Sequence, residues 1–177
     1  MSTPPAPASF THLDSTGAAR MVDVSAKEVT IRQATATGRV LVAPEVIALL
    51  RGPGVPKGDA LSVARIAGIQ GAKRTPDLIP LCHPLAIHGV EVDLAVLDDA
   101  VAITARVRTA DRTGVEMEAL TAVSIALLTV YDMSKAIDRS MVISDISLAE
   151  KSGGVGGDYT RLDGTPPASY PESAGTR

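Results

Sequence analysis

A long, almost entirely apolar helix is the strongest constraint that the sequence places on the fold. The pattern predicts this helix from about Val115 to Lys135. No polar stripe runs along its middle, so we expect it to be buried on most of its sides. The residues able to do chemistry lie at its ends, with Glu116 and Glu118 at the start and Asp132 and Lys135 at the finish. Glu116 and Lys135 should be about 28 Å apart along the axis, so one small pocket in a single subunit cannot use both ends.

The composition predicts one soluble, cytoplasmic domain. A chain of 177 residues, 45% of them hydrophobic, can bury a core of its own. The net charge of −3 and the near absence of aromatic residues argue against nucleic-acid or membrane-surface binding. The single cysteine excludes an intramolecular disulfide and fits a reducing compartment. We expect no signal peptide, because the first twenty residues lack an apolar core, and no membrane span, because the long helix is short and interrupted by Thr and Ser.

The order of predicted elements indicates an α+β, ferredoxin-like fold. The pattern gives a strand within 28–42 that bends near Gly38, a helix in two pieces, two strands joined at 98–99, the long helix and a strand within 141–148. Pro44 suits the start of the first helical piece, Asp59 suits an N-cap for the second, and Pro76 should end it. This is the split βαβ order, which forms one antiparallel sheet with helices packed on one face. The domain should cover 10–159, with disordered segments at 1–9 and 160–177.

The two ends of the long helix carry the first candidate site residues. Asp132 and Lys135 are three positions apart and share a helix face, so the carboxylate can orient the ammonium group. A solvated surface ion pair is the alternative interpretation. Glu116 and Glu118 could recognise a substrate, although acidic residues are common in a first helical turn in any case.

Three further segments could bind an anion or position a substrate. Lys57 lies in a Gly/Pro-rich loop before a predicted helix, and Lys151 precedes four glycines within six residues. Flexible solvated loops are the alternative for both. Cys82 and His83 lie between two prolines that stiffen their loop. A structural histidine is the alternative there, and one cysteine with three scattered histidines makes a zinc site unlike any usual ligand set.

Several long motifs, taken together and in order, resemble the cyclic pyranopterin monophosphate synthases, the molybdenum cofactor biosynthesis protein C family. The resemblance runs from about Phe10 to Tyr159. The motifs that carry it are Met21-Val22-Asp23-Val24-Ser25, Lys57-Gly58-Asp59, Ala67-Gly68-Ile69-Gln70, Lys73-Arg74-Thr75, Leu78-Ile79-Pro80-Leu81-Cys82-His83-Pro84-Leu85, Thr113-Gly114-Val115-Glu116-Met117-Glu118-Ala119-Leu120-Thr121, Tyr131-Asp132-Met133, Lys135-Ala136 and Lys151-Ser152-Gly153-Gly154.

The resemblance implies a lyase that converts 3′,8-cyclo-7,8-dihydro-GTP to cyclic pyranopterin monophosphate and pyrophosphate. It also implies a homo-hexamer, built as a trimer of dimers, with active sites at subunit interfaces. By motif position Lys57, Asp132 and Lys135 take the catalytic places. The substrate-binding places fall on Leu81, Cys82, His83, Glu116, Met117, Glu118, Lys73 and Lys151.

The same resemblance leaves two alternatives open. We expect no metal bound by the protein, although Mg²⁺ could accompany the triphosphate. Where the family usually has Lys-Ser-Gly, this chain has Val155-Gly156-Gly157, which removes a cation and a hydroxyl; Arg112 and Ser134 replace a usual Lys and Cys. A non-catalytic nucleotide-binding paralogue on the same fold is therefore the competing hypothesis.

Overall fold

One five-stranded antiparallel sheet sets the frame of the molecule. The computed structural model describes residues 12–14, 16–52 and 54–161. The strands are β1 (Thr30–Leu41), β2 (Ile87–Val96), β3 (Ala100–Asp111), β4 (Val142–Ser152) and β5 (Tyr159–Thr160). Their order is β2-β3-β1-β4-β5, and each neighbouring pair is antiparallel. With the helices between β1 and β2 and between β3 and β4, this arrangement confirms the predicted α+β, ferredoxin-like fold.

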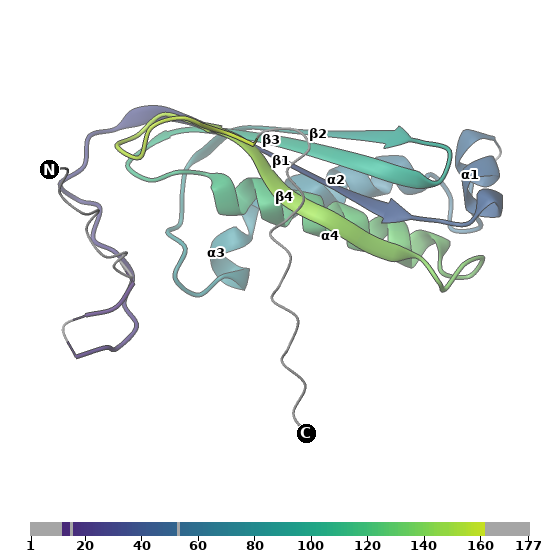
Figure 1. Ribbon diagram of the computed structural model, residues 1–177, viewed down its shortest axis with the longest axis horizontal. Coiled ribbons are helices and arrows are strands. Elements are labelled where there is room, and N and C mark those ends of the chain that lie inside the picture. The colour runs from purple at the N-terminus through teal and green to yellow at the C-terminus, as the bar shows by residue number, and fades with distance from the viewer. Residues whose placement is uncertain (1–11, 15, 53, 162–177) are drawn as a thin grey trace, which may run out of the picture.

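Two helices cover one face of this sheet. The four helices are α1 (Pro44–Arg51), α2 (Ala60–Lys73), α3 (Thr75–Leu78) and α4 (Glu116–Ser134). Figure 1 shows α2 and α4 lying beneath the sheet, with α1 at one end of it. No described helix covers the opposite face. The prediction that helices pack on one face is therefore correct.

Most element boundaries follow the local signals in the sequence. Pro44 opens α1, and the Asp59 carboxylate caps α2 by accepting a hydrogen bond of 3.0 Å from the amide of Ser62. The prediction that Pro76 ends the second helix is wrong in detail, because α2 already stops at Lys73. Pro76 instead lies in the first turn of α3, where a backbone N–H would have no hydrogen-bond partner within the helix, so its absence costs nothing.

The end of the sheet differs from the prediction. β4 continues to Ser152 instead of ending near Leu148, and Thr160 pairs with Glu150 through β5. The predicted start of the disordered tail, residue 160, is therefore too early, because Thr160 belongs to β5. The other residues expected to be disordered, 1–9 and 162–177, lie outside the described residues.

Glycines allow the layers to approach closely. A Cβ atom on Gly38 of β1 would lie 2.8 Å from Val123 and 2.9 Å from Leu127 of α4. A Cβ atom on Gly68 of α2 would lie 3.0 Å from the carbonyl oxygen of Ala122, and the next close glycine, Gly71, faces Thr121 and Ile125. Going from Gly68 to Gly71 along α2, the contacted positions on α4 move towards its N-terminus, so the two helices are antiparallel. The C-terminal end of α2 lies near the start of α4, and the start of α2 near its end.

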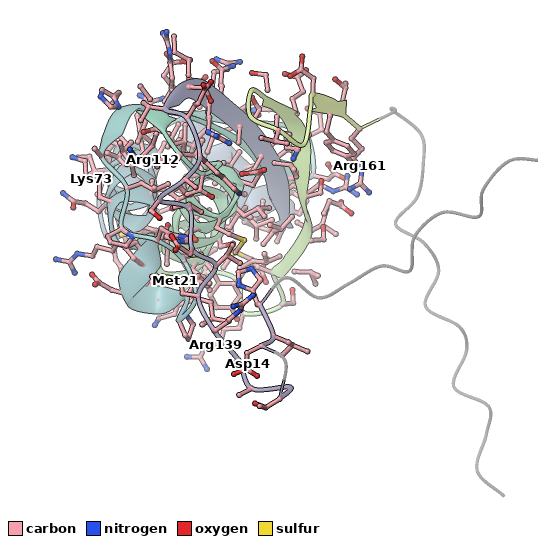
Figure 2. All side chains as sticks on the ribbon, turned by 90° about the vertical axis from the view of Figure 1, so that its left-hand side faces the viewer. Asp14, Met21, Lys73, Arg112, Arg139 and Arg161 are labelled. Carbon is pink, nitrogen blue, oxygen red and sulfur yellow. The ribbon has the colours of Figure 1, made fainter. Side chains whose placement is uncertain are left out.

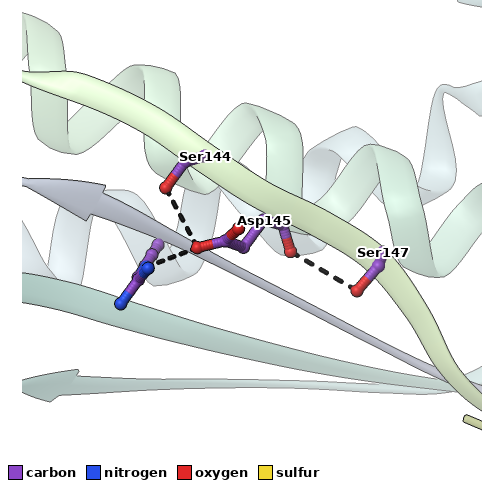
Figure 3. A network of polar contacts seen from close by, with 4 residues as sticks. Ser144, Asp145 and Ser147 are labelled. Carbon is purple, nitrogen blue, oxygen red and sulfur yellow. Dashed lines mark hydrogen bonds and ion pairs between the residues drawn. The ribbon is translucent and has the colours of Figure 1, made fainter. Parts of the chain in front are cut away.

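The predicted bend near Gly38 is a pair of irregularities in β4. The pairing of β1 with β4 shifts between Thr35 and Ala36 and again between Thr37 and Arg39, while the pairing with β3 stays continuous. At the second shift Asp145 adopts φ 57°, the one positive φ of a non-glycine residue in the described chain. Figure 3 shows its carboxylate contacting Ser144 and its carbonyl accepting a hydrogen bond from Ser147. The Arg39 guanidinium also contacts that carboxylate and holds the distorted segment against β1.

Helix α4 forms the centre of the core, as predicted. Ten of its nineteen residues are buried, and the core around it consists mainly of Ala and Val with a few Ile and Leu. Contrary to the prediction, the length and apolarity of this helix are sufficient to cross a membrane. Its burial against α2 and the sheet accounts for the same composition.

Candidate active site

The first cluster of charged residues lies at the C-terminal end of α4. The Asp132 carboxylate contacts the ammonium groups of Lys57 at 2.7 Å and Lys135 at 2.6 Å. Lys135 reaches it along the same helix face, as the three-residue spacing predicts. Lys57 is 75 positions away in sequence and arrives because the antiparallel packing puts the start of α2 beside this end of α4. The three predicted catalytic residues therefore come together around one carboxylate.

The two lysines control the charge state of Asp132. Their hydrogen bonds, with that of Lys135 the larger, lower the pKa of the Asp132 carboxyl to about 2. The carboxylate is therefore ionised throughout the physiological range. All three side chains remain about half exposed, so a ligand could reach the two ammonium groups from solvent.

The second cluster is a pocket at the N-terminal end of α4. It has a volume of about 240 Å³. Six of the predicted substrate-binding residues line it, together with four others. The lining consists of His12, Leu81, Cys82, His83, Leu85, Thr113, Gly114, Glu116, Met117 and Glu118. The loop after α3 and the first turn of α4 supply most of these residues, so the two segments line one pocket.

Burial gives this pocket a carboxyl group that titrates near neutrality. Glu118 is only 3% exposed, and this desolvation, aided by the charge of Glu116, raises its pKa to about 7. Burial also raises the pKa of the neighbouring Cys82 thiol, with a further contribution from Glu118. The pocket therefore holds a protonated thiol beside a carboxyl group that is about half protonated at neutral pH.

Lys151 joins the same end of the helix from the sheet. Its position on β4 faces the helices, and its ammonium group lies 3.3 Å from the carboxylate of Glu116. The glycines that follow form a turn in which Gly153, Gly154 and Gly157 all have positive φ. The amide of Gly153 donates to Asp158, and that of Gly157 donates to the carbonyl of Gly154. Those two amides are therefore occupied within the turn and do not converge on an anion.

Lys73 is the one predicted site residue that the structure leaves outside both clusters. It is exposed at the C-terminal end of α2 and lies at the edge of the molecule in Figure 2. This end of α2 is near the start of α4, but Lys73 does not line the pocket there. His12 shows the opposite case, since it lines the pocket although the sequence marked it only as a scattered histidine. No local pattern joins residue 12 to residues 81–83 and 116–118, so only the fold could reveal it.

The two clusters are separated by the length of the helix. Glu116 and Asp132 are sixteen positions apart, which corresponds to about 24 Å along α4. Within one chain they therefore form two half-sites. Among residues 12–14, 16–52 and 54–161, no group of three His, Cys, Asp or Glu side chains is placed to hold a metal ion.

These features define a ferredoxin-like protein with lysine–carboxylate clusters at both ends of its core helix. The chain belongs to the MoaC family, whose model matches residues 21–154. It is 74% identical over 152 residues to a cyclic pyranopterin monophosphate synthase of Streptomyces griseus, with 86% of each chain covered. It is 65% identical to the enzyme of that name from a Nocardioides species, covering 88% of this chain and 97% of the relative. For the Roseiflexus relative of the same name the identity is 59%, covering 85% and 96%.

Proposed function

We propose that this protein is a cyclic pyranopterin monophosphate synthase. It would act as a lyase that converts 3′,8-cyclo-7,8-dihydro-GTP to cyclic pyranopterin monophosphate and releases pyrophosphate. Family membership and the names of close relatives support this function. The single structural observation that carries it is the contact of Lys57 and Lys135 with one ionised aspartate.

The lysine cluster suits the phosphate end of such a reaction. Closing a cyclic phosphate expels pyrophosphate, whose negative charge needs nearby cations as it develops. Lys57 and Lys135 present two ammonium groups that are about half exposed to solvent. Asp132 contacts both groups and so holds them close together. A lysine released from Asp132 by the substrate could also take part in proton transfer.

The pocket at the start of α4 suits the base of the nucleotide. The edge of a guanine-derived ring carries N–H donors, for which the carboxylates of Glu116 and Glu118 are matching acceptors. Because Glu118 titrates near pH 7, it can also give up or take a proton during ring rearrangement. Lys151, whose ammonium contacts Glu116, would bind the part of the nucleotide next to the base.

The separation of the clusters favours a site shared between subunits. We infer a homo-hexamer, a trimer of dimers, in which one subunit's lysine cluster faces another subunit's pocket. The exposed Leu128, 54% accessible, and the partly exposed Leu120 lie on α4 between the two clusters and offer an apolar contact for a neighbouring chain. The reaction as proposed requires no metal bound by the protein, although Mg²⁺ could accompany the triphosphate, and we place the enzyme in the cytoplasm.

Turnover of the cyclised nucleotide tests the enzyme function directly. The purified protein should release pyrophosphate and form an oxidisable pterin, and Lys57→Ala or Lys135→Ala should reduce the rate by about a hundredfold or more. The exposed Lys27→Ala variant is the matched control and should keep the wild-type rate. Absence of turnover in the wild type, or full activity in both lysine variants, would refute the proposal.

Mixing Lys57→Ala with Lys151→Ala, each of which we expect to be inactive alone, tests the shared site. Lys57→Ala removes the cluster at one end of α4, and Lys151→Ala removes the cation at the other. If each site combines one end from each of two subunits, a random equal mixture should recover about a quarter of wild-type activity, because half the dimers are mixed and each has one intact site. No recovery after dissociation and reassembly would place the whole site within one chain.

The glycine turn supports the competing function of a nucleotide-binding paralogue. A Cβ atom on Gly156 would lie 3.4 Å from the Lys151 ammonium, so the hydroxyl that the family usually has at this position is lost next to that cation. Val155 is 92% exposed and supplies no charge there. Nucleotide binding without pyrophosphate release, with turnover gained in a Val155→Lys/Gly156→Ser variant, would favour this alternative.

A further inference from the structure

The segment before β1 carries a histidine into the pocket at the start of α4. Residues 12–14 and 16–20 lie side by side, with Leu13 paired with Ala19 and the amide of Arg20 donating to the carbonyl of His12 at 2.8 Å. The Asp14 carboxylate fixes the turn by accepting from the amides of Thr16 and Ala18. Figure 2 labels Asp14 and Met21 along this segment. The backbone of His12 is therefore held in place, although its side chain is exposed.

A second histidine ties the segment to the pocket loop. The Nε2 atom of His83 lies 2.7 Å from the carbonyl oxygen of Val22. A carbonyl can only accept, so this nitrogen carries the proton and donates. His83 itself lines the pocket, two residues after Leu81. The hydrogen bond therefore joins the wall of the pocket to the segment that leads back to His12.

His12 adds an imidazole N–H donor to a pocket whose other donors are the Thr113 hydroxyl, the Cys82 thiol and the protonated form of Glu118. Glu116 and Glu118 offer oxygen acceptors, while the Nε2 proton of His83 is used by Val22. A guanine-derived ring presents a carbonyl oxygen beside its N–H donors, and that oxygen needs a donor. No hydrogen bond joins the His12 ring to any other residue in the described part of the chain. Its imidazole N–H is thus available to a ligand in the pocket.

We propose that His12 is a further substrate-contacting residue, whose imidazole donates a hydrogen bond to the carbonyl oxygen of the guanine-derived base. This proposal rests on the proposed function for the nature of the base. In it the carboxylates bind the N–H edge of the ring and His12 binds the adjacent oxygen.

A comparison of two nucleotides isolates this contact. The probes are GTP and 2-aminopurine riboside triphosphate, which lacks both the carbonyl oxygen and the adjacent N1–H. The effect of a His12 substitution is measured for each nucleotide by calorimetry, so the loss of N1–H is common to wild type and variant. His12→Ala should weaken GTP binding by about tenfold, the effect of one lost hydrogen bond, and 2-aminopurine riboside triphosphate binding by less than about twofold. His12→Gln keeps a donor and should recover part of the loss for GTP.

Leu13→Ala is the matched control on the same segment. Leu13 is 42% exposed and does not line the pocket, so this variant should bind both nucleotides as the wild type does. Unchanged GTP binding by His12→Ala, an equal loss for both nucleotides, or no GTP binding by the wild type would each overturn the proposal. Wild-type turnover is measured separately, so a failed contact with intact turnover refutes only the role of His12. Binding differences without any turnover would refute only the enzyme function.

Discussion

The buried carboxyl group of Glu118 should make the stability of the protein depend on pH. Glu118 is 3% exposed, and burial raises its pKa from 4.5 to about 7 in the folded chain. Between these two values the folded protein binds a proton that the unfolded chain does not. The stabilisation is therefore complete below about pH 4.5 and is lost as the pH rises through 7.

The size of the effect follows from that difference in pKa. One pKa unit corresponds to about 1.4 kcal/mol, so the full shift corresponds to about 3 kcal/mol, of which about 2.5 kcal/mol falls between pH 5 and pH 8. The isosteric variant Glu118→Gln has no titrating group at this position. Its free energy of unfolding, relative to the wild type, should therefore rise by about 2.5 kcal/mol over the same range.

Urea unfolding followed by far-UV circular dichroism provides the assay. The chain has no tryptophan, so fluorescence is a poorer probe, and the protein concentration is held constant because assembly contributes to stability. Glu150→Gln removes the same charge from an exposed position on β4 and should show no comparable trend. A difference between Glu118→Gln and the wild type that stays constant from pH 5 to pH 8 would refute this reasoning.

Three further substitutions test the packing and the charges. Gly38→Ala should lower the free energy of unfolding by about 1–3 kcal/mol in urea titrations, because its Cβ atom would lie 2.8 Å from Val123. Ser134→Ala should raise it by about 1 kcal/mol, since the Ser134 hydroxyl is fully buried and has no hydrogen-bond partner in the described chain. Lys57→Met should raise the pKa of Asp132 from about 2 towards its ordinary 3.8, which a carbon-detected NMR titration would measure. An unchanged free energy of unfolding in Gly38→Ala or Ser134→Ala would contradict the packing argument for that residue. An unchanged pKa of Asp132 in Lys57→Met would contradict the ion pair between Lys57 and Asp132.

Local signals in the sequence were sufficient for most of the architecture. Alternating apolar residues predicted the strands, Asp59 marked the start of α2, and the uninterrupted apolar run identified α4 as the core helix. The errors occurred where tertiary contacts override such signals. β5 forms only because Tyr159 and Thr160 pair back across the glycine turn with β4, and a two-residue strand carries no periodicity.

The site was predictable residue by residue but not as a set of contacts. The spacing of Asp132 and Lys135 predicted their ion pair, because both lie on one helix. The contact between Lys57 and Asp132 depends on close packing of α2 against α4 at Gly68 and Gly71, which neither segment indicates alone. The contacts of His12 and Val22 with the pocket likewise depend on the tertiary fold and could not be predicted from the local sequence.

The composition of α4 also constrains how the two half-sites can be completed. α2 and the sheet bury two sides of the helix, which explains the apolar residues on those sides. They do not explain Leu128, which is 54% exposed about one turn before Asp132. If a neighbouring subunit's α4 packed antiparallel against this side, it would cover Leu128 and also bring each lysine cluster towards the partner's pocket. One interface would then account for both the unpaired apolar side and the separation of the charges, and it is the arrangement that the mixing experiment would detect.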